Sequence, residues 1–400
     1  MVTVTEAEEI ILSHSKNFGT EHVDYNQSYR RVLANPLIAD RDLPPFNRVT
    51  MDGIAIDYKG FSNGNRQFSI TGIQAAGSET MEITSETECI EIMTGAALPR
   101  STNTIIRYED LNIANDTASV LSESVQEGQN IHVKASDKKK GEVIVEAGNI
   151  ITPAIISIAA SIGVKMLPVK KNPSVVIVST GDELVGIDSI PNPFQIRSSN
   201  AYFLQSALLR EGIKAEILHL KDNKEDMIPG LQTCLEYDVM IISGGISMGK
   251  FDMVPAVLEE LEVKKLFYKV AQKPGRPFWF GRHQKGTLVF ALPGNPMSTC
   301  LCYYRFFLPW LKNSLGLEQA KAFAALSEPF SFKPMLTCFL PVKLVFTEEG
   351  KLIAYPVKAN GSGDYSSLTT TDAFLELPAE QSNFEQGEIF KVLPLPNNYL

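Results

Sequence analysis

The alternation of apolar and polar positions divides the chain into segments of different texture. Thr5 and Glu8 have the spacing of a capping box ahead of an apolar run at 10–12, which predicts a first helix ending near Lys16. Residues 46–130 hold short apolar runs separated by Gly, Asn, Ser and Thr, the pattern of strands joined by turns. The chain is therefore expected to begin with a helix and continue into a β-rich segment.

A different pattern begins near residue 171, where apolar strands alternate with helices. The predicted strands are 174–179, 215–219, 239–243 and 288–292, and the predicted helices are 200–210, 225–235, 255–261 and 297–310. Because the strands are apolar throughout rather than at every second position, we expect a mostly parallel sheet covered by helices on both faces. Short strands and turns return after about residue 326.

These textures predict a multidomain chain of α/β plus β class. A helical stretch opens at Pro153 and ends at Gly163. We expect it to pack on the first helix, so that 1–45 and 131–170 form one discontinuous helical domain. The remaining predicted domains are a β-rich inserted domain at 46–130, a central α/β domain at 171–325 and a small C-terminal β domain at 326–400.

Composition and charge narrow the class of protein. With 44% hydrophobic and 21% charged residues, the 400-residue chain resembles packed globular proteins, and its net charge of −9 argues against a nucleic-acid-binding surface. The N-terminus lacks the pattern of a signal peptide, and the uncharged stretch 149–164 is too short to cross a membrane. Five scattered cysteines suit free buried thiols in a reducing compartment. We therefore expect a cytoplasmic protein.

Candidate chemistry lies where the predicted parallel strands end. Three of them run into small, glycine-containing turns at 179–183, 243–247 and 292–296. Ligands of open α/β sheets bind outside the carboxyl ends of the strands, where glycines let backbone N–H groups approach an anion. We expect the three turns to form one pocket, in which Gly245 and Ser247 of the second turn contact substrate.

Charged side chains near these turns indicate the kind of ligand. The carboxylates of Asp182, Glu183 and Asp252 accompany the turns. A nearby segment supplies the cations Lys269, Lys273 and Arg276. Mg²⁺ prefers oxygen ligands and phosphate pairs with Lys or Arg, so the set predicts a phosphate-bearing ligand with Mg²⁺, for which Glu183 and Asp252 are the candidate metal ligands.

A phosphate-loop motif competes with this interpretation. Residues 244–250 match the loop in glycine and lysine spacing and follow a predicted strand. Phe251, however, stands where a Ser or Thr hydroxyl would hold Mg²⁺. We therefore interpret the match as coincidental but keep a phosphate-loop nucleotidase as an alternative, which turnover of free ATP would favour.

Six short motifs carry a resemblance to a known family. They are PPFNRVTMDGIAI (44–56), MTGAALP (93–99), VSTGDEL (178–184), SGGISMG (243–249), QKPGRP (272–277) and LPGNPMS (292–298). Motifs of this kind recur in the same order in MoeA-type molybdopterin molybdenumtransferases and in the gephyrin E domain. The chain resembles that family over nearly its whole length.

The resemblance implies an elongated, four-domain homodimer that inserts molybdenum from molybdate into adenylylated molybdopterin and releases AMP. The site would be shared, with the α/β domain of one subunit facing the β-rich domain of the other. By motif position, the resemblance implies catalytic roles for Asp52, Thr94, Glu183 and Asp252. It implies substrate contacts for Asp182, Asp222, Lys269, Lys273, Pro293, Pro296 and Ser298. The protein that adenylylates the pterin is a candidate partner.

Several positions depart from the family's pattern. Lys250 replaces an acidic residue, Ser198 replaces an Asp, and His132-Val-Lys-Ala-Ser-Asp137 replaces an Arg-rich segment ending in Gly-Glu-Asp. These departures leave open a pterin-binding paralogue with another substrate. A non-catalytic scaffold is a further alternative, although no long linker or fused domain supports it. The residues do not distinguish molybdate from tungstate.

Overall fold

The computed structural model describes residues 1–246, 253–318, 320–358, 361, 363–364 and 366–395. The chain divides into two compact units. Unit 1 contains Met1–Glu21, Arg30–Val32 and Pro168–Leu400, and unit 2 contains His22–Tyr29 and Leu33–Leu167. The four-domain division remains a prediction, and the two units are described separately below.

Unit 2 is built around a six-stranded sheet with the order β7-β4-β6-β5-β9-β8. Its strands are β4 (Gly53–Ile56), β5 (Gln67–Gln74), β6 (Glu88–Ile92), β7 (Thr104–Arg107), β8 (Leu111–Ala114) and β9 (Thr117–Val120). The short helix α2 (Tyr58–Ser62) contributes Phe61 to the same core as Phe68 and Ile106. The β-rich texture predicted for this part of the sequence is therefore observed.

Smaller elements complete unit 2 and its ends. They are β1 (Thr20–Asp24), η1 (Tyr25–Gln27), β2 (Leu37–Ile38), β3 (Arg48–Val49), η2 (Tyr108–Asp110), β10 (Ile131–His132), β11 (Val143–Val145), α3 (Pro153–Ser161) and β12 (Met166–Lys170). Thr152 caps α3, Pro153 begins it, and Gly163 follows its end with a φ of 74°. Proline at the start and glycine just past the end are the residues that favour these helix boundaries.

The central sheet of unit 1 has six strands in the order β16-β13-β17-β21-β20-β18. The strands β16 (Glu216–Leu220), β13 (Val175–Thr180), β17 (Val239–Ser243) and β21 (Leu288–Leu292) are parallel. The strands β20 (Trp279–Arg282) and β18 (Lys264–Tyr268) add an antiparallel edge. The predicted mostly parallel sheet is confirmed, but these two edge strands were not predicted.

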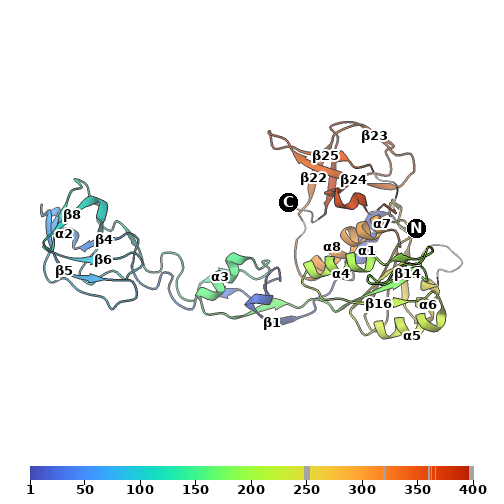
Figure 1. The fold of residues 1–400 in the computed structure, drawn as a ribbon, viewed down its shortest axis with the longest axis horizontal. Helices are drawn as coiled ribbons and strands as arrows, with labels where there is room; N and C mark the ends of the chain where they lie inside the picture. The colour runs from blue at the N-terminus through green and yellow to red at the C-terminus, as the bar shows by residue number, and fades with distance from the viewer. Residues whose placement is uncertain (247–252, 319, 359–360, 362, 365, 396–400) are drawn as a thin grey trace. The chain divides into compact units, whose positions relative to one another are not determined.

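Helices cover both faces of this sheet (Figure 1). They are α1 (Val4–Leu12), α4 (Asn200–Arg210), α5 (Lys224–Cys234), α6 (Val254–Glu260), α7 (Pro296–Cys302), the π-helical turn η3 (Tyr303–Phe307) and α8 (Leu308–Ser314). Val175 and Ile177 pack with the core beneath α1, α4, α7 and α8, whereas Val176 and Val178 pack with α5 and α6. Successive side chains of β13 point to opposite faces of the sheet, and both faces are buried. Residues 175–178 of the strand are therefore all apolar.

The first helix is shorter than predicted and has a different cap. Thr3, not Thr5, is the N-cap, and its side chain exchanges hydrogen bonds with Glu6 in a complete capping box. Both pairs have the same spacing. Starting the helix at Val4 buries Val4 together with Ala7 and Ile11 on one face, so burial selects the first pair.

The C-terminal part of unit 1 forms a second six-stranded sheet. Its strands are β19 (Gln272–Lys273), β22 (Ala322–Leu326), β24 (Thr337–Phe346), β25 (Leu352–Pro356), β26 (Ala373–Leu377) and β28 (Ile389–Pro394), accompanied by β23 (Phe330–Ser331), β27 (Asn383–Phe384) and η4 (Ser366–Thr369). Pairing of β24 with both β25 and β26 closes five of the strands into a small barrel. The strand β19 joins it in parallel with β24, so Lys273 lies beside Cys338.

A buried arginine links three parts of unit 1. Arg305 on η3 is 4% exposed and pairs with Glu8 of α1 at 2.9 Å and with Glu376 of β26 at 3.5 Å. A buried guanidinium requires such partners, because an unpaired charge in the interior is strongly destabilising. The network therefore fixes the first helix and the barrel to the helices of the α/β sheet.

Candidate active site

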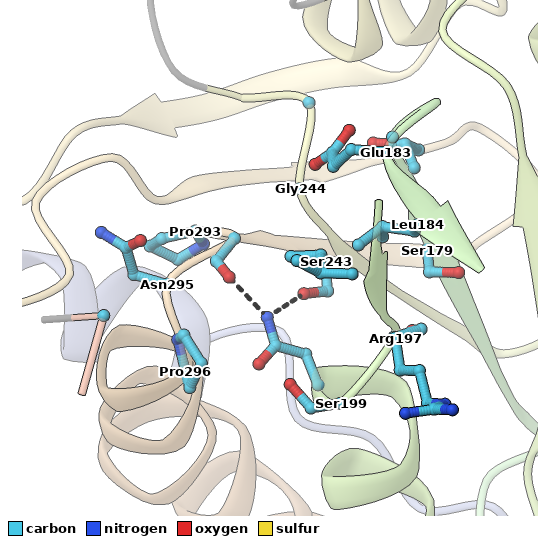
Figure 2. Close-up of a pocket in the computed structure, with 18 of the residues that line it drawn as sticks. Ser179, Glu183, Leu184, Arg197, Ser199, Ser243, Gly244, Pro293, Asn295 and Pro296 are labelled. Carbon is cyan, nitrogen blue, oxygen red and sulfur yellow. Dashed lines mark hydrogen bonds between the residues drawn. The ribbon is translucent and has the colours of Figure 1, made fainter. Parts of the chain in front are cut away.

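A cavity of about 940 Å³ lies at the carboxyl ends of the parallel strands of unit 1. Residues of all three predicted turns line it: Ser179, Thr180, Gly181, Ser243, Gly244, Gly245, Pro293, Gly294 and Asn295. Figure 2 shows side chains from these turns around the opening. The expectation that the turns form one pocket is confirmed, and we refer to it as the main cavity.

Glycine is required in the second turn by its close approach to the first. Gly244 and Gly245 have φ angles of 102° and 67°, which disfavour any residue with a side chain. A Cβ on Gly244 would lie 2.8 Å from the Thr180 carbonyl oxygen, and one on Gly245 would lie 2.7 Å from the Thr180 hydroxyl. The two turns can therefore approach this closely only because both positions are glycine.

The hydroxyl of Thr180 is a buried polar group of the main cavity. Thr180 is 3% exposed, and its Oγ1 has no hydrogen-bond partner within the described part of the chain. Leaving a buried hydroxyl without a partner costs about 1–3 kcal/mol, and such groups are often satisfied by a ligand or an ordered water. Thr180 is therefore a candidate contact that sequence analysis did not identify.

Asn200 connects two of the turns. Its side-chain amide donates to the Ser243 hydroxyl at 3.0 Å and to the Gly294 carbonyl at 2.7 Å (Figure 2, dashed lines). Asn200 begins α4, directly after the cavity-lining residues Arg197 and Ser199. One side chain thus holds the turns after β17 and β21 at a fixed separation.

The predicted carboxylates of the first turn occupy different positions. Glu183 lines the main cavity, and its backbone carbonyl accepts a hydrogen bond from Ile196 N–H at 2.8 Å. This bond lies beside the two-residue strands β14 (Leu184–Val185) and β15 (Ile196–Arg197). Asp182 is not among the lining residues, and its carboxylate instead accepts the Asp222 N–H at 3.2 Å. Asp182 therefore positions Asp222, which does line the cavity.

Other predicted residues of this region are partly accounted for. Gly245, Pro293 and Pro296 line the main cavity. Ser247 and Asp252 lie outside the described residues, as do Lys250 and Phe251. The predicted roles of Ser247 and Asp252 therefore remain predictions.

The predicted cations line a neighbouring cavity rather than the main one. Lys273, Arg276 and Ser298 line a cavity of about 410 Å³ together with Phe330, Phe332 and Leu340 of the C-terminal sheet region. We call it the aromatic cavity. Pro277, Pro293 and Asn295 line both cavities, so the two adjoin. Lys269 lines neither.

Local backbone geometry directs the segment around Lys273. Gly275 has a φ of 83°, and a Cβ there would lie 2.8 Å from the Gln272 side-chain nitrogen. Gln272 is fully buried and donates to the Gly275 carbonyl at 3.1 Å. This tight turn places Lys273 and Arg276 at one cavity, as predicted, although Lys269 is not included.

Asp52 and Thr94 meet in unit 2. The Thr94 N–H donates to the Asp52 carboxylate at 2.6 Å, and this bond, with the Thr94 side chain, lowers the pKa of Asp52. The next residue, Gly53, has to be glycine, because a Cβ at this position would lie 1.9 Å from the Ile106 carbonyl oxygen. Asp52 is therefore an exposed, ionised carboxylate, and the backbone of Thr94 in the 93–99 motif holds it in place.

The positions that depart from the family pattern form contacts of their own. Ser198 lines the main cavity. In unit 2, Arg48 lies 3.0 Å from His132 Nδ1, and His132 Nε2 lies 2.7 Å from the Asp137 carboxylate. Because a guanidinium only donates, Nδ1 is the acceptor and Nε2 carries the proton. Asp137 and Arg48 thus fix the orientation of the ring.

The described residues could hold Mg²⁺ only if a bound ligand supplied part of the coordination shell. Among the described residues, no three Asp, Glu, His or Cys side chains gather as a metal-binding group. Mg²⁺ usually takes one or two protein carboxylates and completes its shell with water and phosphate oxygens. Glu183 at the main cavity fits that smaller contribution.

Three family models match successive parts of the chain. The MoeA N-terminal region, described as domains I and II, matches residues 2–163. The probable molybdopterin binding domain matches residues 176–313, and the MoeA C-terminal region, domain IV, matches residues 324–395. Together these models cover most of the sequence.

Individual proteins match over nearly the full length. A molybdopterin molybdenumtransferase of Synechocystis sp. is 42% identical over 394 residues, covering 98% of this chain and 99% of that protein. The Bacillus subtilis protein of the same name is 29% identical over 405 residues, covering 98% and 94%. A crystal structure titled as a molybdopterin biosynthesis MoeA protein of Pyrococcus horikoshii has a TM-score of 0.81 at 28% identity, covering 98% of this chain and 99% of its own. The predicted fold and resemblance are confirmed, and the chain belongs to the MoeA family.

Proposed function

We propose that this chain is a molybdopterin molybdenumtransferase that inserts molybdenum from molybdate into adenylylated molybdopterin and releases AMP. The observation that carries the proposal is the main cavity, where three glycine-containing turns and the Glu183 carboxylate meet. The predicted transferase class is confirmed by relatives of that name, which include one at 42% identity over nearly the whole chain.

The main cavity suits the adenylylated, phosphate-bearing substrate. Glycine-containing turns at strand ends expose backbone N–H groups. These neutral groups bind phosphate oxygens by donating hydrogen bonds. Asn200 keeps two of these turns in register, and the unpartnered Thr180 hydroxyl can donate to a bound oxygen. Mg²⁺ held in part by Glu183 would supply positive charge to the phosphate. A Mg²⁺ requirement is part of the proposal.

The aromatic cavity suits the second, smaller substrate. Molybdate is a doubly charged oxyanion, and Lys273, Arg276 and Ser298 offer it two cations and a hydroxyl. Because the two cavities share Pro277, Pro293 and Asn295, an oxyanion bound in one would lie next to a pterin nucleotide bound in the other. Proximity of two bound reactants accelerates their reaction by removing the entropy cost of their encounter.

Replacing Lys273 tests the placement of molybdate. We expect Lys273→Ala to raise the KM for molybdate by about tenfold or more, because a charged hydrogen bond in a partly enclosed site is lost. Lys343→Ala is the matched control, since Lys343 is an exposed lysine on β24 of the same C-terminal sheet that does not line the cavity. Steady-state assays over a range of molybdate concentrations measure both. An equal rise in KM for the two variants would contradict the placement.

Asn200 provides a test of the main cavity's geometry. We expect Asn200→Ala to lower kcat by about tenfold to a hundredfold, because the turns at Ser243 and Gly294 lose their common donor and shift from the reactive arrangement. Gln205→Ala is the control on the same helix, where Gln205 donates to the Ala215 carbonyl at 3.0 Å. Similar kcat values for both variants would mean that Asn200 serves the fold alone.

A shared site in a homodimer is a further part of the proposal. Asp52 lies in unit 2 and Glu183 in unit 1. If a site takes Asp52 from one subunit and Glu183 from the other, mixing two variants can rebuild an intact site. If Asp52→Asn and Glu183→Gln are each inactive, co-refolded mixtures should regain about a quarter of wild-type activity, because half of the dimers are mixed and each holds one intact site. AMP release measures the recovery. Control-level activity in verified mixed dimers would rule out sharing.

The cellular setting is inferred from the cysteines. All five are unpaired and buried, as predicted for a protein of a reducing compartment. Among the described helices, none has the length and apolar character needed to span a bilayer. We therefore propose a cytoplasmic location. The protein that adenylylates molybdopterin is the proposed partner, because it makes the proposed substrate.

A further inference from the structure

A third cavity of unit 1 lies away from both cavities described above. Its volume is about 610 Å³, and its lining includes His14, Lys264, Leu266, Arg282 and His283. Arg282 pairs with Leu288, the first residue of β21, whereas the main cavity lies beyond the last residue of that strand. The third cavity, which we call the edge pocket, is therefore at the opposite end of the sheet.

Two cations face each other in the edge pocket without a carboxylate partner. Lys264 of β18 and Arg282 of β20 are directly opposite in the antiparallel pairing. Like charges in opposite positions destabilise a sheet. The ion pairs found among the described residues include neither of them. Both side chains are exposed, and two neighbouring cations at one pocket suit an anionic ligand in a chain whose net charge is −9.

One carboxylate, Glu262, also lines the pocket. It accepts a hydrogen bond at 2.6 Å from the side chain of Gln284, another lining residue, and forms no ion pair with Lys264 or Arg282. Lys285, which follows Gln284, pairs with Glu236 at 2.7 Å and is thereby directed to another partner. Among the described residues, Lys264 and Arg282 therefore form no ion pair with the acidic groups nearest to them in the sequence.

A buried histidine adds a donor to the two cations. His283 is 6% exposed and lines the pocket. Its Nδ1 accepts the Lys285 N–H at 3.3 Å, so in the neutral ring Nε2 carries the proton. No hydrogen bond is found for Nε2 within the described part of the chain. This imidazole N–H is an independent indication that the pocket takes a hydrogen-bond acceptor.

The lining of the pocket also includes an imidazole ring, His14, and an apolar side chain, Leu266. His14 Nδ1 lies 2.8 Å from the Ile10 carbonyl and must donate to it, which fixes the ring. The ring packs edge-on against Phe280, with 5.9 Å between the centroids. A ligand that fills the pocket would therefore place a small organic group here.

We infer that the edge pocket binds a small phosphate monoester, with Lys264, Arg282 and the His283 Nε2–H holding the phosphate and His14 and Leu266 contacting its organic part. Arg and Lys are the side chains best suited to phosphate, and an imidazole N–H supplies a directional third bond. The inference does not depend on the activity proposed above, because none of these residues lines the main or the aromatic cavity.

Calorimetric titration of the full-length protein with phenyl phosphate and with inorganic phosphate tests the inference. We expect saturable binding, tighter for phenyl phosphate, and a loss of about tenfold or more in affinity for the Lys264→Gln, Arg282→Gln double variant, because two charged hydrogen bonds are removed. The control is Lys265→Gln at the next position of β18, an exposed lysine that does not line the edge pocket. Its affinity should stay within about twofold of the wild type, since no direct phosphate contact is removed.

Histidine ring signals in NMR spectra locate the bound phosphate. His14 and His283 report on the edge pocket, whereas His219, which lies 3.1 Å from the Ser179 hydroxyl, reports on the main cavity. The inference predicts that phenyl phosphate shifts the His14 and His283 signals at concentrations that leave His219 unchanged. Absence of saturable binding, shifts confined to His219, or equal losses in Lys265→Gln and the double variant would each overturn it.

Discussion

Glu183→Gln is expected to reduce molybdate-dependent AMP release by about a hundredfold to a thousandfold, the range associated with loss of one group that stabilises charge in the transition state. The reason is that the carboxylate that would help to hold Mg²⁺ is removed. The substitution keeps the size of the side chain and removes its charge at the main cavity. The backbone carbonyl of Glu183 still accepts the Ile196 N–H, so the turn itself is retained. The predicted effect is therefore on turnover rather than on folding.

Unfolding measurements separate the two effects. Glu183 is exposed, and exposed substitutions usually change stability by less than about 0.5 kcal/mol. The urea midpoint of Glu183→Gln should therefore match that of the wild type. Glu259→Gln, on α6 and outside the lining of the main cavity, is the control and should retain full turnover. An active Glu183→Gln would remove this residue from the catalytic set.

Arg305→Met is expected to lower the free energy of unfolding of unit 1 by about 3 kcal/mol, because it leaves the carboxylates of Glu8 and Glu376 without their buried partner. Tryptophan fluorescence during urea unfolding measures this, since both tryptophans, Trp279 and Trp310, lie in unit 1. Lys391→Met is the control. It removes a more exposed cation that lies 3.7 Å from the same Glu376 carboxylate, so its effect should stay below about 1 kcal/mol.

The cost of Arg305→Met should depend on pH. Burial raises the pKa of Glu8, but the hydrogen bond and charge of Arg305 outweigh it and leave the pKa below its usual value of 4.5. The stabilisation is therefore complete above pH 4.5 and is lost as the pH falls through the folded-state pKa. The difference between wild type and variant should shrink in acid. A difference that stays constant or grows below pH 4.5 would show that Arg305 acts through packing alone.

The sequence predicted the centre of the fold because its signals there are local. Uninterrupted apolar runs marked β13, β17 and β21, and the glycines after them marked the turns of the main cavity. The edge strands were missed for a physical reason. The exposed pair Lys264 and Lys265 opens β18, and an antiparallel edge does not show the apolar run of a central parallel strand.

The candidate site was predicted less completely because its contacts join distant residues. Asn200 reaches partners 43 and 94 positions away, and no spacing rule relates these residues in the sequence. Lys273 was expected beside the three turns, but β19 pairs with β24 and thereby places this lysine in the aromatic cavity. The choice of cavity depends on a strand pairing that a single sequence does not reveal.

The assigned roles of Asp52, Thr94 and Glu183, the Mg²⁺ requirement and the shared dimeric site remain proposals. The hydrogen bond between Asp52 and Thr94 brings the 44–56 and 93–99 motifs together. Both residues lie in unit 2. Complementation and the single variants described above address each proposal separately.

The central claim is tested most directly by incubating the purified protein with adenylylated molybdopterin, Mg²⁺ and molybdate. AMP release and molybdenum bound to the pterin are measured in the same samples, with parallel samples lacking molybdate and samples containing ATP in place of the pterin nucleotide. The account predicts that AMP release requires molybdate and equals molybdenum uptake. AMP release that is independent of molybdate, or turnover of ATP without pterin, would contradict it.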